Sequence, residues 1–266
     1  MNAKHAIAPE DRILNLVPST GTEHDWTLAD ATDAGLLAAA PPPRSVDRRK
    51  SWWTIGDQGK TGSCVGWAGA WGVGWALLRA AERISGTDRL SPRYLWMASK
   101  ETDVFTERPT SFVESDGTSL KAACDIARKY GFALEADVPF AIRTTMYLGS
   151  VNALYASNAQ RKIASYINLR KDPGAWKMWL WENGPIMAGL AVDRYWMQCG
   201  ADGVLDAYDP AAVYGGHAVC ICGYREDGTF IVRNSWGTSW GDRGYAYITA
   251  AYLEAAFFDE SYGMHV

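Results

Sequence analysis

The chain has 266 residues, of which 48% are hydrophobic and 21% are charged, so it can bury one large core or two medium ones. This balance excludes a disordered chain. The formal net charge of -4 is spread along the sequence without a basic stripe that could bind a phosphate backbone, so we do not expect nucleic acid as a partner.

Residues 1–40 show no strong periodicity and lead into three consecutive prolines at 41–43, where an extended backbone makes a good boundary. The first residues lack the apolar core of a secretory signal, and no later run is long enough to span a bilayer. The expected compartment is therefore the cytosol, with no membrane partner, although non-classical export stays open.

Residues 58–78, QGKTGSCVGWAGAWGVGWALL, predict a central buried helix with Cys64 in its first turn. Each interior glycine costs roughly 1 kcal/mol relative to alanine, so tight packing against the glycine surfaces must offset this cost. Unpaired backbone N–H groups and the helix dipole at this end favour a thiolate. The sequence therefore places a candidate nucleophile beside a polar loop, where a cleft can reach it.

Three further helices are marked by an N-cap residue, and the first and third also have proline at the first helical position. They are LSPRYLWMASKE with Ser91 as cap, DGTSLKAACDIARKYGF with Thr118 or Ser119, and DPGAWKMWLWENGP with Asp172. Beyond residue 184 the pattern changes to short apolar or alternating runs, which predict an antiparallel sheet from PIMAGLAV, HAVCICGY, TFIVRNSW and GYAYITA. This order indicates an α+β protein with two subdomains and a cleft between them.

The five cysteines are too few and too irregularly spaced for a disulfide-stapled secreted domain. Cys220 and Cys222 alternate along a predicted strand and share one face. They are conceivable as a metal pair, but two small buried side chains are favoured, and neither a metal nor a cofactor is expected.

A lone cysteine is more often structural than catalytic, and a lone histidine is more often a satisfied core residue. Of four histidines, only His217 lies within a strand-like segment, 153 residues beyond Cys64; Asn234 follows at a strand end. The order Cys, His, Asn is the one found in papain and its relatives.

From about Val46 to Ile248 the chain resembles the papain-like cysteine peptidases, through the blocks QGKTGSC, GGHAVCICGY and NSWGTSWGDRGY. The resemblance implies an α+β fold of two subdomains. A mainly helical one, residues 41–150, would carry the nucleophile helix, and a β-barrel-like one, residues 151–266, would carry the histidine and the asparagine.

The same resemblance implies the roles of the site residues. Cys64 would attack the peptide carbonyl as a thiolate, and His217 would stabilise that thiolate and then protonate the leaving amine. Asn234 would orient the imidazole, while Gln58 and the backbone N–H of Cys64 would stabilise the oxyanion. Trp236 would shield the histidine and the asparagine from water.

Substrate binding is implied at Gly117, Gly189, Gly215 and Trp236, with a pocket that is wide or is reshaped by Tyr214 or Met187. Three positions depart from the family pattern. Asp116 replaces the first of the paired glycines that line the substrate cleft in relatives, so that only Gly117 remains. Thr61 replaces a cysteine that forms a disulfide in secreted relatives, in agreement with a reducing compartment, and Val65 replaces the aromatic residue that follows the nucleophile.

Residues 1–40 are either a short pro-segment lying in the cleft or an arm packed on the second subdomain. The apolar anchors Leu14, Leu16, Val17 and Trp26 favour the arm.

The expected function is a monomeric thiol protease acting on peptides or proteins. An acyl transferase of transpeptidase or transglutaminase type would use the same residues, and a non-catalytic binding module could retain the fold.

Overall fold

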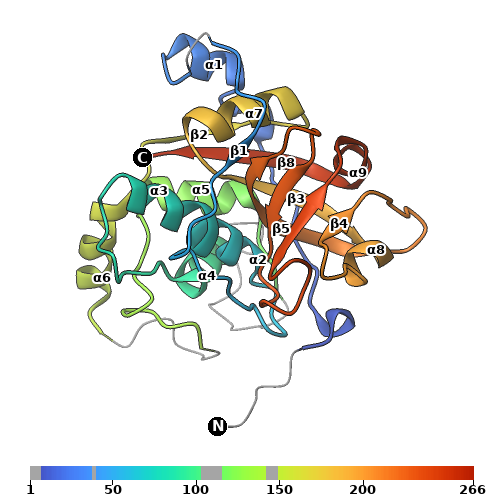
Figure 1. The fold of residues 1–266 in the computed structure, drawn as a ribbon. Helices are drawn as coiled ribbons and strands as arrows, with labels where there is room; N and C mark the ends of the chain where they lie inside the picture. Colours follow the sequence, from blue (N-terminus) through green and yellow to red (C-terminus); the bar gives the residue numbers. More distant parts are fainter. Residues whose placement is uncertain (1–6, 38–39, 103–115, 142–148) are drawn as a thin grey trace.

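The computed structural model describes residues 7–37, 40–102, 116–141 and 149–266, and it has a helical side and a sheet side (Figure 1). The central helix of the helical side is continuous. Its middle is π-helical, and its parts are α2 (Cys64–Gly66), η3 (Trp67–Gly74) and α3 (Trp75–Ala80). The predicted helix is thus confirmed, while its π-helical middle was not predicted.

Glycines let the central helix approach its neighbours closely. A methyl group on Gly66 would lie 2.2 Å from the carbonyl oxygen of Pro92, and one on Gly72 would lie 2.9 Å from Cβ of Cys220. These contacts join the helix to a second helix on one side and to the sheet on the other. They supply the compensation that the sequence requires for glycine in a helix interior.

The other predicted helices begin at their predicted caps. The Ser91 hydroxyl accepts from the Tyr94 N–H, Ser119 accepts from Ala122, and the Asp172 carboxylate accepts from two N–H groups of the first turn. The helices are α4 (Pro92–Thr102), α5 (Leu120–Lys129) and α7 (Pro173–Glu182); the remaining helices are α6 (Val151–Asn158), η4 (Ala159–Arg161), α8 (Arg194–Met197) and α9 (Ala250–Ala256).

The four predicted strands form the middle of a larger sheet with the order β2-β8-β3-β5-β6-β7-β4. Its pairs are antiparallel except for β4 with β7, and the short β1 (Val46–Asp47) also pairs with β5. The strands are β2 (Ser165–Asn168), β3 (Ile186–Asp193), β4 (Val204–Leu205), β5 (Val213–Tyr224), β6 (Phe230–Arg233), β7 (Tyr245–Ile248) and β8 (Phe257–His265). The C-terminal strand β8 was not predicted, and it lies between β2 and β3.

Two hydrophobic cores flank the sheet. One surrounds the central helix and includes Cys64, Cys220 and Cys222; the other lies beneath α7 and includes Trp176 and Trp179. Cys220 and Cys222 are therefore small buried core residues. Among the described residues, no helix has the length and apolarity needed to cross a bilayer.

The N-terminal segment has two parts that lie in different places. After η1 (Pro9–Asp11), residues 12–19 run between the helical side and the sheet, and Asn15 pairs with Gly216 of β5. After η2 (Thr22–His24), the chain forms α1 (Leu28–Asp33), and Ala31 and Leu37 join the core beneath α7. The segment therefore both enters the region between the subdomains and packs on the second one.

Candidate active site

Cys64 is the first residue of the central helix, and its side chain is fully buried. Burial raises the pKa of the Cys64 thiol to about 11, although backbone N–H groups of Ala218, Val65 and Cys64 itself act in the opposite direction. The helix start was expected to favour a thiolate, but in this arrangement the loss of hydration outweighs the N–H groups. Because Ala218 follows His217 on β5, its contact places the thiol against the strand that carries the histidine.

His217 and Asn234 form a buried pair. Nε2 of His217 lies 2.8 Å from Oδ1 of Asn234, and the backbone N–H of Ser235 donates to the same oxygen at 2.8 Å. An atom that accepts from an N–H must be the amide oxygen, so Nε2 carries the hydrogen. Nδ1 is then the basic nitrogen, and it has no hydrogen-bond partner among the residues that the structure describes.

The same burial keeps the histidine neutral. It lowers the pKa of His217 to about 4; the hydrogen bond to Asn234 opposes this shift, and the positive charge of Arg12 adds to it. Thiol and imidazole are therefore both uncharged in this arrangement. Because burial is the largest cause of both shifts, access of water to the site would bring the two pKa values closer together.

Gln58 ties the loop before Cys64 to the residue after Asn234. Its Nε2 donates to the carbonyl oxygen of Thr61 at 3.0 Å, and its Oε1 accepts from the hydroxyl of Ser235 at 2.8 Å. Its backbone N–H donates to the Ser235 carbonyl oxygen at 2.9 Å. Gln58 is fully buried, and hydrogen bonds hold both the nitrogen and the oxygen of its side-chain amide.

Aromatic rings enclose the histidine. The ring centroid of Trp236 lies 5.3 Å from that of His217, and Trp196 lies 6.0 Å from it on an edge-to-face contact. Trp240 contacts both tryptophans. Since Trp236 is only 2% exposed, the cluster excludes water from the imidazole and the amide.

The three glycines predicted to bind substrate all contact the N-terminal segment. A methyl group on Gly117 would lie 1.8 Å from the carbonyl oxygen of Asn15, one on Gly215 would lie 2.2 Å from that of Leu14, and one on Gly189 would lie 2.8 Å from Cδ2 of Leu16. The segment thus lies along the predicted cleft.

Two backbone hydrogen bonds hold this segment, one on each side. The Leu16 N–H donates to the carbonyl oxygen of Gly216 at 3.1 Å, and the Val17 N–H donates to that of Thr118 at 3.2 Å. Gly216 belongs to β5, and Thr118 directly precedes the cap of α5. Residues 16 and 17 therefore bridge the two subdomains.

The site contains residues that the sequence patterns did not single out. Phe258 and Gly216 pack around Leu16: a methyl group on Gly216 would lie 3.1 Å from the Phe258 ring and 3.2 Å from Cβ of Leu16. Met187 is instead buried against Gly69 of the central helix, and Tyr214 is 58% exposed. The apolar wall beside Leu16 thus comes from β8, the strand that was not predicted.

Arg12 and Asp57 were also missed. Their side chains form an ion pair, and the Arg12 side chain is only 2% exposed. Because Asp57 directly precedes Gln58 in the sequence, its position could have suggested that this carboxylate lies at the site. No neighbouring residue in the sequence indicates the role of Arg12, because its partner Asp57 is 45 residues away.

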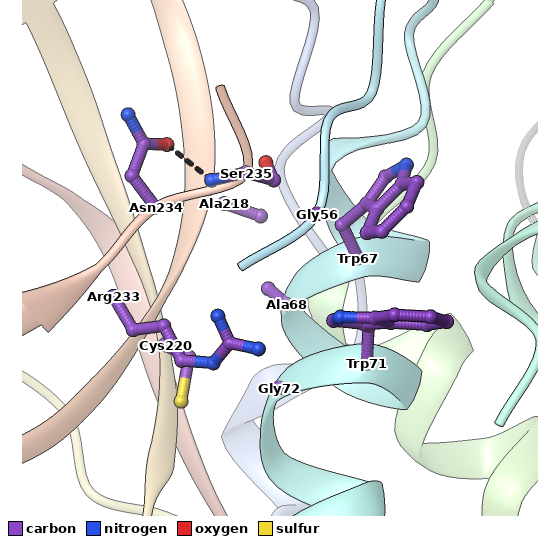
Figure 2. A pocket seen from close by; sticks show the side chains of 10 residues that line it. All are labelled: Gly56, Trp67, Ala68, Trp71, Gly72, Ala218, Cys220, Arg233, Asn234 and Ser235. Atoms are coloured by element: carbon purple, nitrogen blue, oxygen red, sulfur yellow. Dashed lines mark hydrogen bonds between the residues drawn. The ribbon is translucent and has the colours of Figure 1, made fainter. Parts of the chain in front are cut away.

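A small cavity lies behind the site, between the central helix and the sheet (Figure 2). Its water-accessible volume is about 10 Å³, which is room for one water molecule. The guanidinium of Arg233 points into it, and its carbon lies 4.7 Å from the ring centroid of Trp53. One N–H of this group donates to the carbonyl oxygen of Thr54 at 2.5 Å. Arg233 thus joins the two subdomains next to Asn234.

Comparisons of the sequence and of the fold with known proteins agree with one another. The family model described as papain family cysteine protease matches residues 42–257. Macrodontain-1 of Ananas macrodontes is 36% identical over 102 residues, covering 38% of this chain and 46% of its own, and fruit bromelain of Ananas comosus is 28% identical over 209 residues, covering 76% and 54%. The chain thus spans about half the length of these curated relatives.

A solved structure has the same overall fold. Xylellain, a cysteine protease from Xylella fastidiosa, superposes with a TM-score of 0.75 at 20% identity, over 96% of this chain and 97% of its own. At this identity the likeness shows the fold, which is the α+β arrangement expected from the sequence.

Proposed function

The chain belongs to the papain family of cysteine proteases, and from this premise we infer that it hydrolyses peptide bonds through a thioester on Cys64. The observation that carries the inference is the hydrogen-bond state of His217. Its Nε2 is held by Asn234 while its basic Nδ1 has no partner among the described residues, and the next residue along β5 contacts the Cys64 thiol. An imidazole that is oriented through one nitrogen and has a free basic nitrogen on the other side can act as the proton acceptor for the thiol.

The reaction follows from these groups. Nδ1 of His217 takes the proton of Cys64, and the thiolate sulfur attacks the substrate carbonyl carbon. The second hydrogen of the Gln58 Nε2, which the hydrogen bond to Thr61 leaves available, and the backbone N–H of Cys64 donate to the oxyanion. The tetrahedral intermediate collapses to a thioester as His217 protonates the leaving amine, and water then hydrolyses the thioester with His217 as base.

Residues 12–17 would keep this site closed. They lie on the three predicted substrate-binding glycines, and Cys64 and His217 are both buried and uncharged while the segment is in place. The leaving amine must reach His217, so a substrate would run from the acyl side toward Trp236. The segment runs the other way, from Arg12 at Trp236 to Leu16 at Gly189, which presents its peptide bonds in reverse. We therefore infer that the N-terminal segment is a pro-segment as well as an arm.

Free thiols support a reducing compartment for this enzyme. All five cysteines are unpaired, and Thr61 stands where secreted relatives carry a disulfide cysteine. Disulfides are rare in the cytosol because glutathione and thioredoxin keep thiols reduced. Cytosolic action on peptide or protein substrates is therefore part of the proposal.

The decisive experiment incubates reporter peptides with the full chain and with its Leu16→Asp variant, which should open the site, and weighs the products. Hydrolysis is expected, and it should be lost on Cys64→Ala. The control Cys199→Ala removes a half-buried thiol outside the site and should leave hydrolysis unchanged. A second incubation contains a primary amine. Predominant amide products would support the acyl transferase, and no product together with unreactive Cys64 would support a binding module.

A further inference from the structure

We propose that Asp57 and Trp236 form a subsite for a basic side chain of the substrate, on the leaving-group side of the scissile bond. The proposal rests on the peptidase function above and adds a substrate class to it. Preferred substrates would carry arginine or lysine shortly after the bond that is cleaved.

In the folded chain this subsite is filled by Arg12. The guanidinium pairs with the carboxylate of Asp57, and its N–H groups donate to the carbonyl oxygens of Gly59 at 3.2 Å, Trp236 at 3.3 Å and Ile7 at 3.5 Å. Its central carbon lies 5.6 Å from the ring centroid of Trp236. A carboxylate, carbonyl oxygens and an indole face together are the partners that a guanidinium or ammonium group prefers.

Most of these partners do not belong to the N-terminal segment. The Asp57 carboxylate accepts from the Gly59 N–H at 2.9 Å, and Asp57 pairs with Trp236 in an antiparallel bridge. The Gly237 N–H donates to the carbonyl oxygen of Gly56 at 2.9 Å and fastens the same two strands of chain. The acceptors are therefore fixed by the enzyme body and would remain in place after the segment leaves.

The position of the subsite indicates which part of the substrate it would bind. The Trp236 ring lies beside His217, the group that would protonate the leaving amine. Residues of the substrate that follow the scissile bond must therefore pass over Trp236. The Asp57 side chain is still 42% exposed with Arg12 in place, so a side chain can approach it from solvent.

Emptying the subsite in the full chain provides the test. In the variant Arg12→Ala the pocket loses its own guanidinium, and the small probes argininamide and citrullinamide are added separately. Citrulline has nearly the same shape as arginine but no charge. Binding is measured by calorimetry. Hydrolysis is measured after Leu16→Asp has been added to open the site, on peptides with arginine or citrulline at each of the first three positions after the cleaved bond. Arg12→Gln repeats both measurements with a longer neutral side chain, in case Arg12→Ala does not fold.

Argininamide should bind at least about tenfold more tightly than citrullinamide, the discrimination expected of a half-exposed ion pair with a cation–π contact. Adding Asp57→Asn, which keeps an acceptor for the Gly59 N–H, should remove the difference. Adding Glu226→Gln, which removes an exposed carboxylate in the turn between β5 and β6, should preserve it.

The outcomes separate the two proposals. Equal binding of both probes, or a preference that survives Asp57→Asn, would overturn the basic subsite even if peptides are hydrolysed. Selective argininamide binding without any hydrolysis would support the subsite and count against the peptidase function. Hydrolysis with the same rate for arginine and citrulline peptides would leave the peptidase standing and reject the subsite.

Discussion

The imidazole of His217 donates through Nε2 to Oδ1 of Asn234 over 2.8 Å, and this one contact fixes both the tautomer and the orientation of the ring. It also depends on a third group, since the Ser235 N–H identifies the accepting atom as oxygen. The basic nitrogen is thereby directed away from Asn234 and is available for chemistry.

Removal of the Asn234 amide should therefore impair proton transfer more than substrate binding. In the Leu16→Asp background, Asn234→Ala is expected to lower kcat about 10²-fold with little change in KM, because the ring loses its fixed tautomer. Steady-state kinetics on one peptide measure the split. Asn152→Ala, the same substitution on the exposed face of α6, should change neither constant. An effect confined to KM would contradict the orienting role.

Opening of the N-terminal segment should expose Cys64. Leu16 is 5% exposed and packs against Gly189 and Phe258, so Leu16→Asp would bury an unpaired carboxylate and expel residues 12–17. The rate of Cys64 alkylation by iodoacetamide at pH 7 should rise at least about tenfold. Trp26→Asp places the same charge on the same segment where the side chain is 53% exposed, and it should have little effect. An unchanged rate in a folded Leu16→Asp chain would reject closure by this segment.

The buried histidine should make stability depend on acid pH. The pKa of His217 is about 4 in the folded chain and 6.5 in a free histidine, so between these values the unfolded chain binds a proton that the folded chain does not. The contribution of His217 is fully present above pH 6.5 and declines as the pH falls toward 4. Urea unfolding at pH 7 and pH 4.5 measures this loss of stability.

Two variants isolate this effect from the carboxyl groups that titrate in the same range. Burial raises the pKa values of Glu135 and Glu260 to about 7, and these groups act in the opposite direction. His217→Gln should lose less stability on acidification than the parent chain. His24→Gln, which removes an exposed histidine, should match the parent. Equal acid sensitivity in all three chains would show that His217 is not shielded as the structure indicates.

Packing at the central helix gives a stability prediction. Gly66→Ala raises helix propensity by roughly 1 kcal/mol, but its methyl group would lie 2.2 Å from the Pro92 carbonyl oxygen. We expect a net loss of about 1–3 kcal/mol in the free energy of unfolding, because two helices must separate. Gly174→Ala in the first turn of α7 meets only one side-chain oxygen, at 3.1 Å, and should be close to neutral. Chemical denaturation of both variants measures the difference, and stabilisation by Gly66→Ala would contradict the close approach.

The sequence alone determined the elements whose signals are local. Ser91, Ser119 and Asp172 cap their helices because a side-chain oxygen needs only the next few residues to satisfy the free N–H groups. Strand β8 was not predicted because Glu260 and Ser261 interrupt its apolar pattern. In the folded chain both are buried, and their partners, Ser19 for Glu260 and Trp176 for Ser261, come from distant segments.

The candidate site, too, was predictable from the sequence only in part. The order of Cys64, His217 and Asn234 could be read along the chain, since the family resemblance rests on three short blocks. The protonation state of the site could not be read, because the pKa values of Cys64 and His217 depend on how completely other segments exclude water from them. The same holds for the position of Arg12 against Asp57: a contact across 45 residues is decided by packing in three dimensions and leaves no periodic pattern in the sequence.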